Sequence, residues 1–165
     1  MFRIAQLLYL LLPVYAANMA APFARFAPRL ARPISPRWLG SHKTWLGCAL
    51  AVVASTATAW AQARLRWPGG VVNYDDWFVL GTVCGSAAMV GDSAKSLVKR
   101  RLGIAPGKPW LPADQLDYVV AGLLALCAWY RPAWIDVVIV LGVSFAGSIV
   151  VNRLSHRFGI KRTPW

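Results

Sequence analysis

The chain has no glutamate, and its six acidic residues are all aspartates, against 18 lysines and arginines that bring the formal net charge to +12. In a soluble protein such an excess of positive charge would suggest a nucleic-acid partner. However, 58% of the 165 residues are hydrophobic, which is more apolar side chain than one soluble core of this size can bury. We therefore expect a membrane protein whose basic residues set its topology and bind anionic phosphates, with no nucleic-acid partner.

Cysteine and histidine are scarce as well, with three and two residues. Cys48, Cys84 and Cys127 each lie in an apolar run, without a CxxC spacing and without a histidine nearby. That pattern argues against a cysteine metal site. We interpret all three cysteines as packing residues.

Four apolar runs are long enough to cross a hydrocarbon core of about 30 Å, which takes roughly 20 helical residues. They cover residues 2–21, 44–63, 77–95 and 133–151. A fifth run, residues 118–130, is short enough to be re-entrant, but it spans if its helix starts near Pro112, a favourable first position. We predict an all-α, polytopic integral membrane protein of about five transmembrane helices, in a single domain over residues 1–165.

The basic residues are distributed unevenly over the segments that connect these runs. Fourteen of the 18 lysines and arginines fall between the first two runs, around and after the end of the third, or in the C-terminal tail. Because cytosolic segments carry the excess of Lys and Arg, we expect the N-terminus outside and the C-terminus in the cytosol. The first run also resembles a cleaved signal peptide. The cations directly after it favour a retained helix, because they oppose translocation.

The third run ends in a polar segment that begins at Gly91-Asp92. Asp92, Lys95, Ser96 and Lys99 recur at helical spacing and therefore share one face, close to the predicted cytosolic boundary. Polar groups at membrane depth are costly, so their presence needs a reason. The alternative is a helix that simply ends in snorkelling lysines and arginines.

Two more aspartates follow after a flexible loop. Asp114 and Asp117 are spaced i, i+3 and are therefore neighbours on a helix. Three carboxylates beside a cationic loop can bind Mg²⁺ while the cations bind phosphates, since Mg²⁺ usually takes one or two carboxylates plus substrate phosphates. We predict a nucleotide site here; plain salt bridges with residues 99–101 are the alternative.

A third candidate opens the second run, where residues 40–45 read Gly-Ser-His-Lys-Thr-Trp. A helix N-terminus binds anions, and Lys43 and Thr44 add a charge and a hydroxyl. The segment lacks the leading glycine pattern of a P-loop. Asn18, near the cytosolic end of the first run, either orients a ligand or bonds a neighbouring helix. We interpret the aspartates near the other side as interfacial or structural: Asp75, Asp76 and Asp136.

Taken together, these motifs resemble the CDP-archaeol synthase family, membrane enzymes related to the phosphatidate cytidylyltransferases. The matching pieces occur in order over nearly the whole chain, which is more specific than any single piece. They are Pro13-x-Tyr15-x-Ala17-Asn18-Met19, Leu39-Gly40-Ser41-His42-Lys43-Thr44-Trp45, Gly91-Asp92-x-x-Lys95-Ser96-x-x-Lys99-Arg100-Arg101-x-Gly103, Asp114-Gln115-x-Asp117 and Gly159-x-Lys161-x-x-Pro164-Trp165.

The resemblance implies a five-helix enzyme of the cytoplasmic membrane whose active site faces the cytosol. It would use CTP and Mg²⁺ to convert a lipid phosphate, phosphatidate-like or of the archaeal ether type, to a CDP-lipid with release of pyrophosphate. It further implies roles for individual residues: Asp92, Asp114 and Asp117 for metal and catalysis, Lys95, Lys99, Arg100 and Arg101 for phosphates, and Asn18, His42, Lys43, Thr44 and Ser96 for substrate. Family members usually carry an Asp ahead of the second motif, where this chain has Pro-Ile-Ser-Pro-Arg at 33–37.

Two other functions fit a basic cytosolic face. One is a small channel or transporter that binds an anion, and the other is a non-catalytic subunit that binds anionic lipid. A transport path would favour charged residues along the crossing helices, yet the second and fifth runs are almost free of charge beyond their ends. We therefore favour the enzyme, and the sequence leaves its oligomeric state open.

Overall fold

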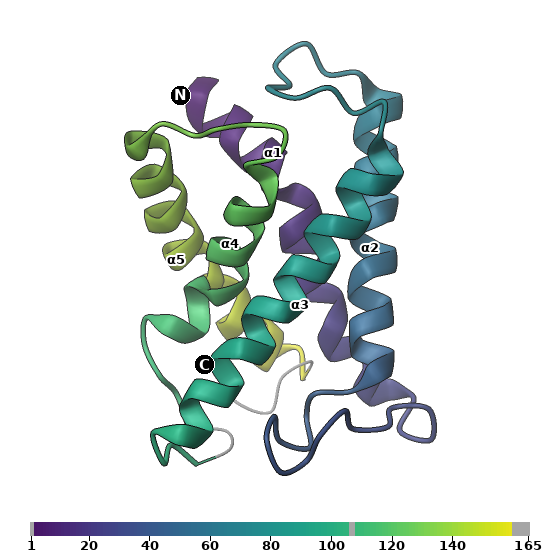
Figure 1. Ribbon diagram of the computed structural model, residues 1–165, viewed down its shortest axis with the longest axis vertical. Helices are drawn as coiled ribbons and strands as arrows, with labels where there is room; N and C mark the ends of the chain where they lie inside the picture. The colour runs from purple at the N-terminus through teal and green to yellow at the C-terminus, as the bar shows by residue number, and fades with distance from the viewer. Residues whose placement is uncertain (1, 106–107, 160–165) are drawn as a thin grey trace.

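The computed structural model describes residues 2–105 and 108–159, and these form a bundle of helices (Figure 1). Its elements are α1 (Phe2–Ala20), the 3-10 helix η1 (Ala21–Phe26), α2 (Trp45–Leu65), α3 (Trp77–Arg101), α4 (Ala113–Leu126) and α5 (Trp134–Arg157). The described residues contain no β-strand, only an isolated bridge between Pro33 and Thr44. The predicted all-α class is confirmed. Three residues of the last predicted motif, Lys161, Pro164 and Trp165, lie outside the described part, as does the tail residue Arg162.

Three helical segments of the described chain are long and apolar enough to cross a membrane: Phe2–Phe26, Trp45–Leu65 and Trp134–Arg157. α3 has 25 residues and continues past the predicted end at residue 95 into a basic last turn. α4 has 14 residues, which at 1.5 Å each is about 21 Å, less than a bilayer core of about 30 Å. Five crossings and their orientation therefore stay predictions.

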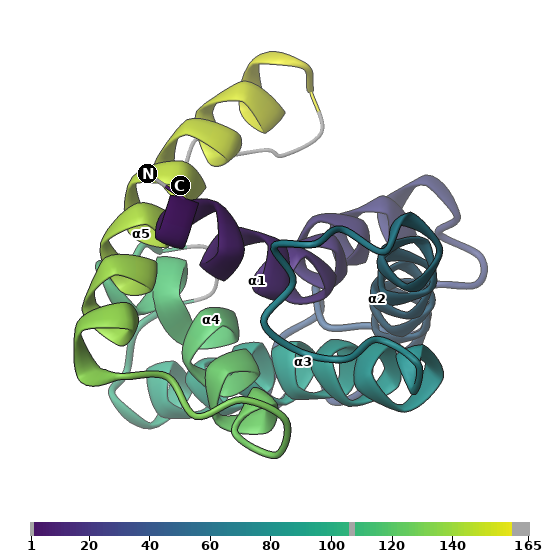
Figure 2. The ribbon, with the colours of Figure 1, turned by 90° about the horizontal axis from the view of Figure 1, so that it is seen from above.

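α1 is the central helix, and it contacts α2, α3, α4 and α5. Its buried side chains include Leu7, Leu10, Leu11, Val14 and Ala17. Because they recur every three or four residues, they form one stripe that faces the neighbouring helices. Figure 2 shows α1 between α5 on one side and the α2–α3 pair on the other.

α2 and α3 pack closely because glycines of α3 lie against the α2 backbone. A Cβ at Gly81 would lie 2.5 Å from Thr56 Cα, and a Cβ at Gly85 would lie 2.8 Å from Val52 Cα. Small residues let the backbones of membrane helices approach each other in this way. These two glycines therefore set the spacing of the helix pair.

α5 lies at the edge of the bundle, where it contacts α4 and α1 (Figure 2). Its buried residues recur at every fourth position and are mostly polar: Asp136, Val140, Ser144, Ser148 and Asn152. The hydroxyl of Tyr15 in α1 shares a 2.7 Å hydrogen bond with the Ser144 hydroxyl. α5 is therefore attached to the bundle through a polar stripe.

An ion pair fastens the start of α5 to the start of α1. Arg3 Nε donates to Asp136 Oδ1 at 3.0 Å, and the Tyr130 hydroxyl donates to Asp136 Oδ2 at 2.9 Å. The Asp136 side chain is only 4% exposed, whereas that of Arg3 is 46% exposed. These contacts agree with the structural role predicted for Asp136.

The three cysteines differ in burial. Cys84 is buried in the core and Cys48 is half-buried, as expected of packing residues. Cys127 is exposed, so its interpretation as a packing residue is wrong. It directly follows the last residue of α4, where Cys127 Sγ donates to the Leu123 carbonyl at 3.3 Å.

The two connections rich in lysine and arginine lie at the same end of the bundle. Figure 1 shows the α1–α2 and α3–α4 connections at its lower end, and the α2–α3 connection with the start of α1 at its upper end. This arrangement agrees with the predicted grouping of cationic segments on one side of the membrane.

Candidate active site

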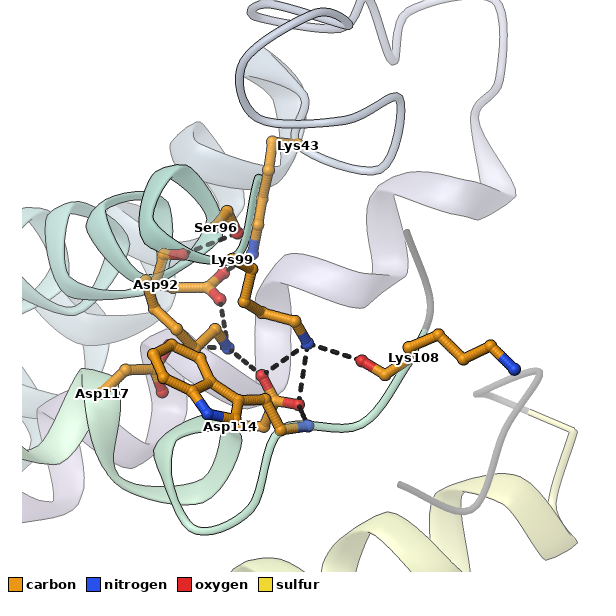
Figure 3. A network of polar contacts seen from close by, with 9 residues as sticks. Lys43, Asp92, Ser96, Lys99, Lys108, Asp114 and Asp117 are labelled. Atoms are coloured by element: carbon orange, nitrogen blue, oxygen red, sulfur yellow. Dashed lines mark hydrogen bonds and ion pairs between the residues drawn. The ribbon is translucent and has the colours of Figure 1, made fainter. Parts of the chain in front are cut away.

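Six charged side chains meet at the lower end of the bundle. They come from three segments: the loop before α2, the last turns of α3 and the first turns of α4. Figure 3 shows several of them converging. We refer to the six as the aspartate–lysine cluster: Lys43, Asp92, Lys95, Lys99, Asp114 and Asp117. Three carboxylates thus face three ammonium groups, and the charges within the cluster balance.

The centre of the cluster is the ammonium of Lys95. Its Nζ lies 3.2 Å from Asp92 Oδ1, 3.1 Å from Asp114 Oδ1 and 2.8 Å from Asp117 Oδ2. Only the contact with Asp92 follows from the i, i+3 spacing on one helix. The other two require α4 to lie directly against α3.

Gly91 allows that close approach of α4 to α3. A Cβ at this position would lie 2.6 Å from the carbonyl oxygen of Asp117 and 2.6 Å from the Cβ of Ala121. Any larger side chain would therefore push the Asp117 backbone away from α3. Gly91 is therefore a positioning residue. No role is predicted for it from the sequence, although a glycine directly before a candidate site aspartate indicates close helix packing.

Asp114 ties the loop before α4 to α3. Lys99 Nζ donates to Asp114 Oδ2 at 3.0 Å and to the Lys108 carbonyl at 2.6 Å (Figure 3). The backbone N–H of Trp110 donates to Asp114 Oδ2 at 2.6 Å. Through these two hydrogen bonds the buried Lys99 holds both the carboxylate and the loop in place.

Lys43, the residue before the N-cap of α2, extends its side chain into the cluster. The Thr44 side chain caps this helix, because its Oγ1 accepts a hydrogen bond from the Gly47 N–H at 3.0 Å. The adjacent Lys43 ammonium contacts Asp92 Oδ2. The 40–45 segment, predicted as a third candidate site, thus contacts the acidic face of α3 through Lys43.

The loop that carries Lys43 is closed at its base by backbone hydrogen bonds. The Ile34 N–H donates to the Lys43 carbonyl at 2.8 Å, and the Trp45 N–H donates to the Arg32 carbonyl at 3.1 Å. These bonds lie beside the bridge between Pro33 and Thr44. The position of Lys43 is therefore set by this short antiparallel pairing.

Two other predicted site residues have their polar groups turned to the backbone. The Ser96 hydroxyl donates to the Asp92 carbonyl one turn earlier, at 2.9 Å. Arg100 Nη1 donates to the Ile104 carbonyl beyond the end of α3, and its Nε is buried without a hydrogen-bond partner among the described residues. Their roles in substrate binding stay predictions.

Three predicted site residues lie outside the cluster. Within the described residues, neither a hydrogen bond nor an ion pair joins Asn18, His42 or Arg101 to any of its six side chains. His42 and Arg101 are exposed, and Asn18 is half-buried on α1. Binding of substrate by these three residues likewise stays a prediction.

An apolar groove lies between α2 and α3, at the same height along α3 as the cluster. Its volume is about 300 Å³, and its lining residues are Cys48, Met89, Val90, Ser93, Ala94 and Leu97. At about 3.6 residues per turn, the lining residues of α3 lie largely on the opposite side of this helix from Asp92, Lys95 and Lys99, at the same height along its axis. A second hollow of about 530 Å³ lies between the same helices toward the other end.

Comparison with known proteins places this geometry in a family. The family model described as CarS-like CDP-archaeol synthase matches residues 1–165. The chain belongs to the CDP-archaeol synthase family. It is 35% identical to the CDP-archaeol synthase of Halobacterium salinarum, over 94% of this chain and 93% of that one. It is 33% identical to the CDP-archaeol synthase of Methanoregula boonei, over 78% and 82% of the two chains.

A solved structure shares the fold. It belongs to an intramembrane enzyme for archaeal membrane lipid biosynthesis and matches with a TM-score of 0.72 and 25% identity, over 90% of this chain and 94% of that one. Membership of the CDP-archaeol synthase family and this likeness confirm the predicted integral membrane protein. They also confirm the predicted CTP-dependent cytidylyltransferase, against the channel and the non-catalytic subunit. The family's chemistry implies dependence on a metal ion.

Proposed function

We propose that the aspartate–lysine cluster is the site where a cytidylyl group passes from CTP to a lipid phosphate. The supporting observation is the meeting of three carboxylates and three ammonium groups from three segments at one end of the bundle. Their side chains are only 7 to 23% exposed. Buried ion pairs contribute little to stability because desolvation offsets their attraction. Binding of a polyanion gives these charges a function that stability does not.

The reaction needs no general base. A phosphomonoester has a second pKa of about 6, so at neutral pH the lipid phosphate is already largely dianionic. One of its oxygens forms a bond to the α-phosphorus of CTP, while the bond from that phosphorus to the oxygen bridging to the β-phosphate breaks. Pyrophosphate leaves with the electron pair. The main obstacle is repulsion between two anions, which explains a site of Asp, Lys and Arg.

The lysines of the cluster counter that repulsion. Lys95 and Lys99 are held by carboxylates in the free protein and can transfer their hydrogen bonds to phosphate oxygens when the triphosphate enters. Arg100 follows Lys99 at the end of α3, and its Nε, which has no hydrogen-bond partner among the described residues, is a further donor. Fixed cations of this kind stabilise charge that develops on the phosphoryl oxygens.

The carboxylates fit Mg²⁺ by donor type. Mg²⁺ prefers oxygen ligands and usually takes one or two carboxylates with substrate phosphates. Asp117 Oδ2 is buried and accepts no aligned hydrogen bond from the described residues; its contact is the ion pair with Lys95. As they stand, the described side chains form no group of three metal ligands, and each of the three aspartates contacts Lys95. Asp92, Asp114 and Asp117 would hold the ion, which would neutralise phosphate charge when bound.

The apolar groove between α2 and α3 suits the chains of a lipid substrate. A lipid phosphate must bring a charged headgroup to the cations while its chains stay in an apolar environment. The groove lined by Cys48, Val90 and Ala94 offers that environment at the same height along α3, on the other side of the helix from Lys95 and Lys99. Given the names of the relatives, we propose a phosphate of an archaeol-type diether lipid as acceptor.

We further propose that the cluster faces the cytosol, which the grouping of the cationic connections supports.

Product analysis tests this function. Purified protein in detergent is incubated with CTP, Mg²⁺ and either a diether or a diester lipid phosphate, and CDP-lipid and pyrophosphate are measured. We expect both products in equal amounts, more from the diether, and none with CTP alone. CTP consumption without CDP-lipid, or with equal yields of CDP and phosphate, would contradict the cytidylyl transfer.

Cysteine labelling tests where the lipid binds. Cys48 lines the groove, whereas Cys127 is exposed at the end of α4 and serves as the internal control. A lipid phosphate should slow the reaction of Cys48 with a maleimide several-fold and leave Cys127 unchanged. Equal rates for Cys48 with and without lipid would place the lipid chains elsewhere.

A further inference from the structure

Lys95 is the one cluster lysine whose described contacts join all three aspartates. Lys43 contacts Asp92, and Lys99 contacts Asp114. The Lys95 ammonium lies 2.8 to 3.2 Å from one oxygen of each of the three carboxylates. A cation surrounded by carboxylate oxygens from two helices has the surroundings that a bound metal ion would have.

Electrostatics explains why some cation must occupy that point. Carboxylates brought together in a partly buried site repel each other, and the repulsion is strong where water is excluded. Each charge of the cluster therefore needs a nearby opposite charge for the site to exist before any ligand arrives. The Lys95 side chain, 13% exposed, supplies the shared one.

The ammonium and a metal ion cannot share the position. Mg²⁺ binds oxygen at about 2.0 to 2.1 Å, whereas the ammonium holds the three oxygens at 2.8 to 3.2 Å. The aspartates are thus already gathered, but they have to move inward by about 1 Å to bind a metal. The flexible four-carbon stem of lysine lets its ammonium leave along with that movement.

We propose that Lys95 is a positioning residue whose ammonium holds Asp92, Asp114 and Asp117 in place of the metal ion until the ion binds. Lys95 then leaves the carboxylates and contacts the triphosphate that enters with the metal. This inference rests on the proposed function, because it assumes that the three aspartates hold a metal. It predicts that Lys95 competes with the metal in the protein without nucleotide.

Metal titration without nucleotide tests the competition. Purified Lys95→Met, Lys99→Met and wild-type proteins are melted over a range of Mg²⁺ and Mn²⁺ concentrations. We expect Lys95→Met to melt lower than wild type without metal, and its midpoint for metal stabilisation to fall about tenfold, since a competing positive charge is gone. Lys99→Met, which removes an ammonium paired with Asp114 alone, should also melt lower but lower the midpoint less than Lys95→Met does, and equal falls in the two variants would overturn the proposal. Unchanged midpoints in both variants would overturn the proposal.

A second pair of variants covers the case in which Lys95→Met does not fold. Asp117→Asn with Lys95→Met removes one charge of each sign and keeps the cluster balanced. Its metal midpoint should lie below that of Asp117→Asn alone, and equal midpoints would overturn the proposal. The product assay of the wild type separates the two hypotheses: CDP-lipid formation together with unchanged midpoints rejects only the role of Lys95.

Discussion

The two ends of the bundle each carry paired charges, but the two groups are connected differently. At one end Arg3 pairs with Asp136, and Tyr130 donates to the same carboxylate. At the other end the aspartate–lysine cluster shares its charges, and the Lys95 ammonium alone contacts three carboxylates.

This difference separates a structural tie from a site. A single cation and a single anion have one arrangement, which here fastens α5 to α1. Charges with several partners can rearrange when a new ion arrives, because each keeps an opposite charge nearby while its partners change. The pattern of connection, more than the presence of ion pairs, therefore distinguishes the proposed active end from the opposite end.

The largest effect should come from removing one carboxylate of the cluster. We expect Asp92→Asn, Asp114→Asn and Asp117→Asn each to lower turnover about 10²- to 10³-fold while the protein still inserts and purifies, because each keeps its size and loses its charge. Product formation per folded protein is the measurement. Asp136→Asn, at the opposite end, and Asp75→Asn should change turnover little. Equal losses in both groups would mean that the carboxylates of both ends serve folding.

Gly91→Ala should be the next most severe change. The new Cβ would meet the Asp117 carbonyl oxygen at 2.6 Å, and a displacement of about 1 Å in a catalytic site can cost about 10²-fold in rate. Gly142→Ala on α5 is the matched control, because a Cβ there has no atom within 4 Å. Kinetics of both variants would decide the matter, and similar rates for the two would refute the positioning role of Gly91.

Nucleotide binding should stabilise the folded protein through the aspartate–lysine cluster and not through the ion pair of Arg3 with Asp136. A ligand at about 100 times its dissociation constant adds about 2.7 kcal/mol to the folded state. We expect this shift in thermal melts with CTP and Mg²⁺, a smaller one with ATP or GTP, and most of it lost without Mg²⁺. Lys99→Ala should weaken all nucleotides alike, whereas Arg3→Gln should leave the shift intact. Identical shifts for CTP and inorganic triphosphate would indicate generic polyanion binding.

The smallest effect should come from breaking the tie between α1 and α5. Arg3→Gln removes the charged partner of Asp136, and because Arg3 is 46% exposed we expect a loss of about 1 kcal/mol in stability with unchanged turnover. Arg131→Gln, an exposed arginine in the connection before α5, is the control and should melt like wild type. A fall in turnover for Arg3→Gln would show that the two ends are coupled.

Local spacing predicted much of the site. Asp92, Lys95 and Lys99 share a helical face in the sequence, and the structure places all three in one cluster. The i, i+3 spacing of Asp114 and Asp117 likewise put both carboxylates within reach of α3. Periodicity determines such relations because they lie within one helix.

Relations between helices could not be predicted in the same way. The contacts of Lys95 with α4 depend on how closely two helices approach, and that distance is set by the missing side chain of Gly91. The length of α4 was also ambiguous, since the apolar run and Pro112 allowed a full span, yet the helix has 14 residues. The position of α5 at the edge of the bundle depends on packing that no single segment encodes.

In the loop before α2, the closed base separates the position of Lys43 from the sequence and length of the rest of the loop. The bonds between Ile34 and Lys43 and between Trp45 and Arg32 fix where Lys43 stands. The residues between these two bonded pairs form a loop whose ends are held together, and doubling the length of such a loop costs only about 0.6 kcal/mol. Insertions, deletions or substitutions between residues 35 and 41 can therefore accumulate without moving the lysine, so this segment can diverge between relatives while the charges of the aspartate–lysine cluster stay in register.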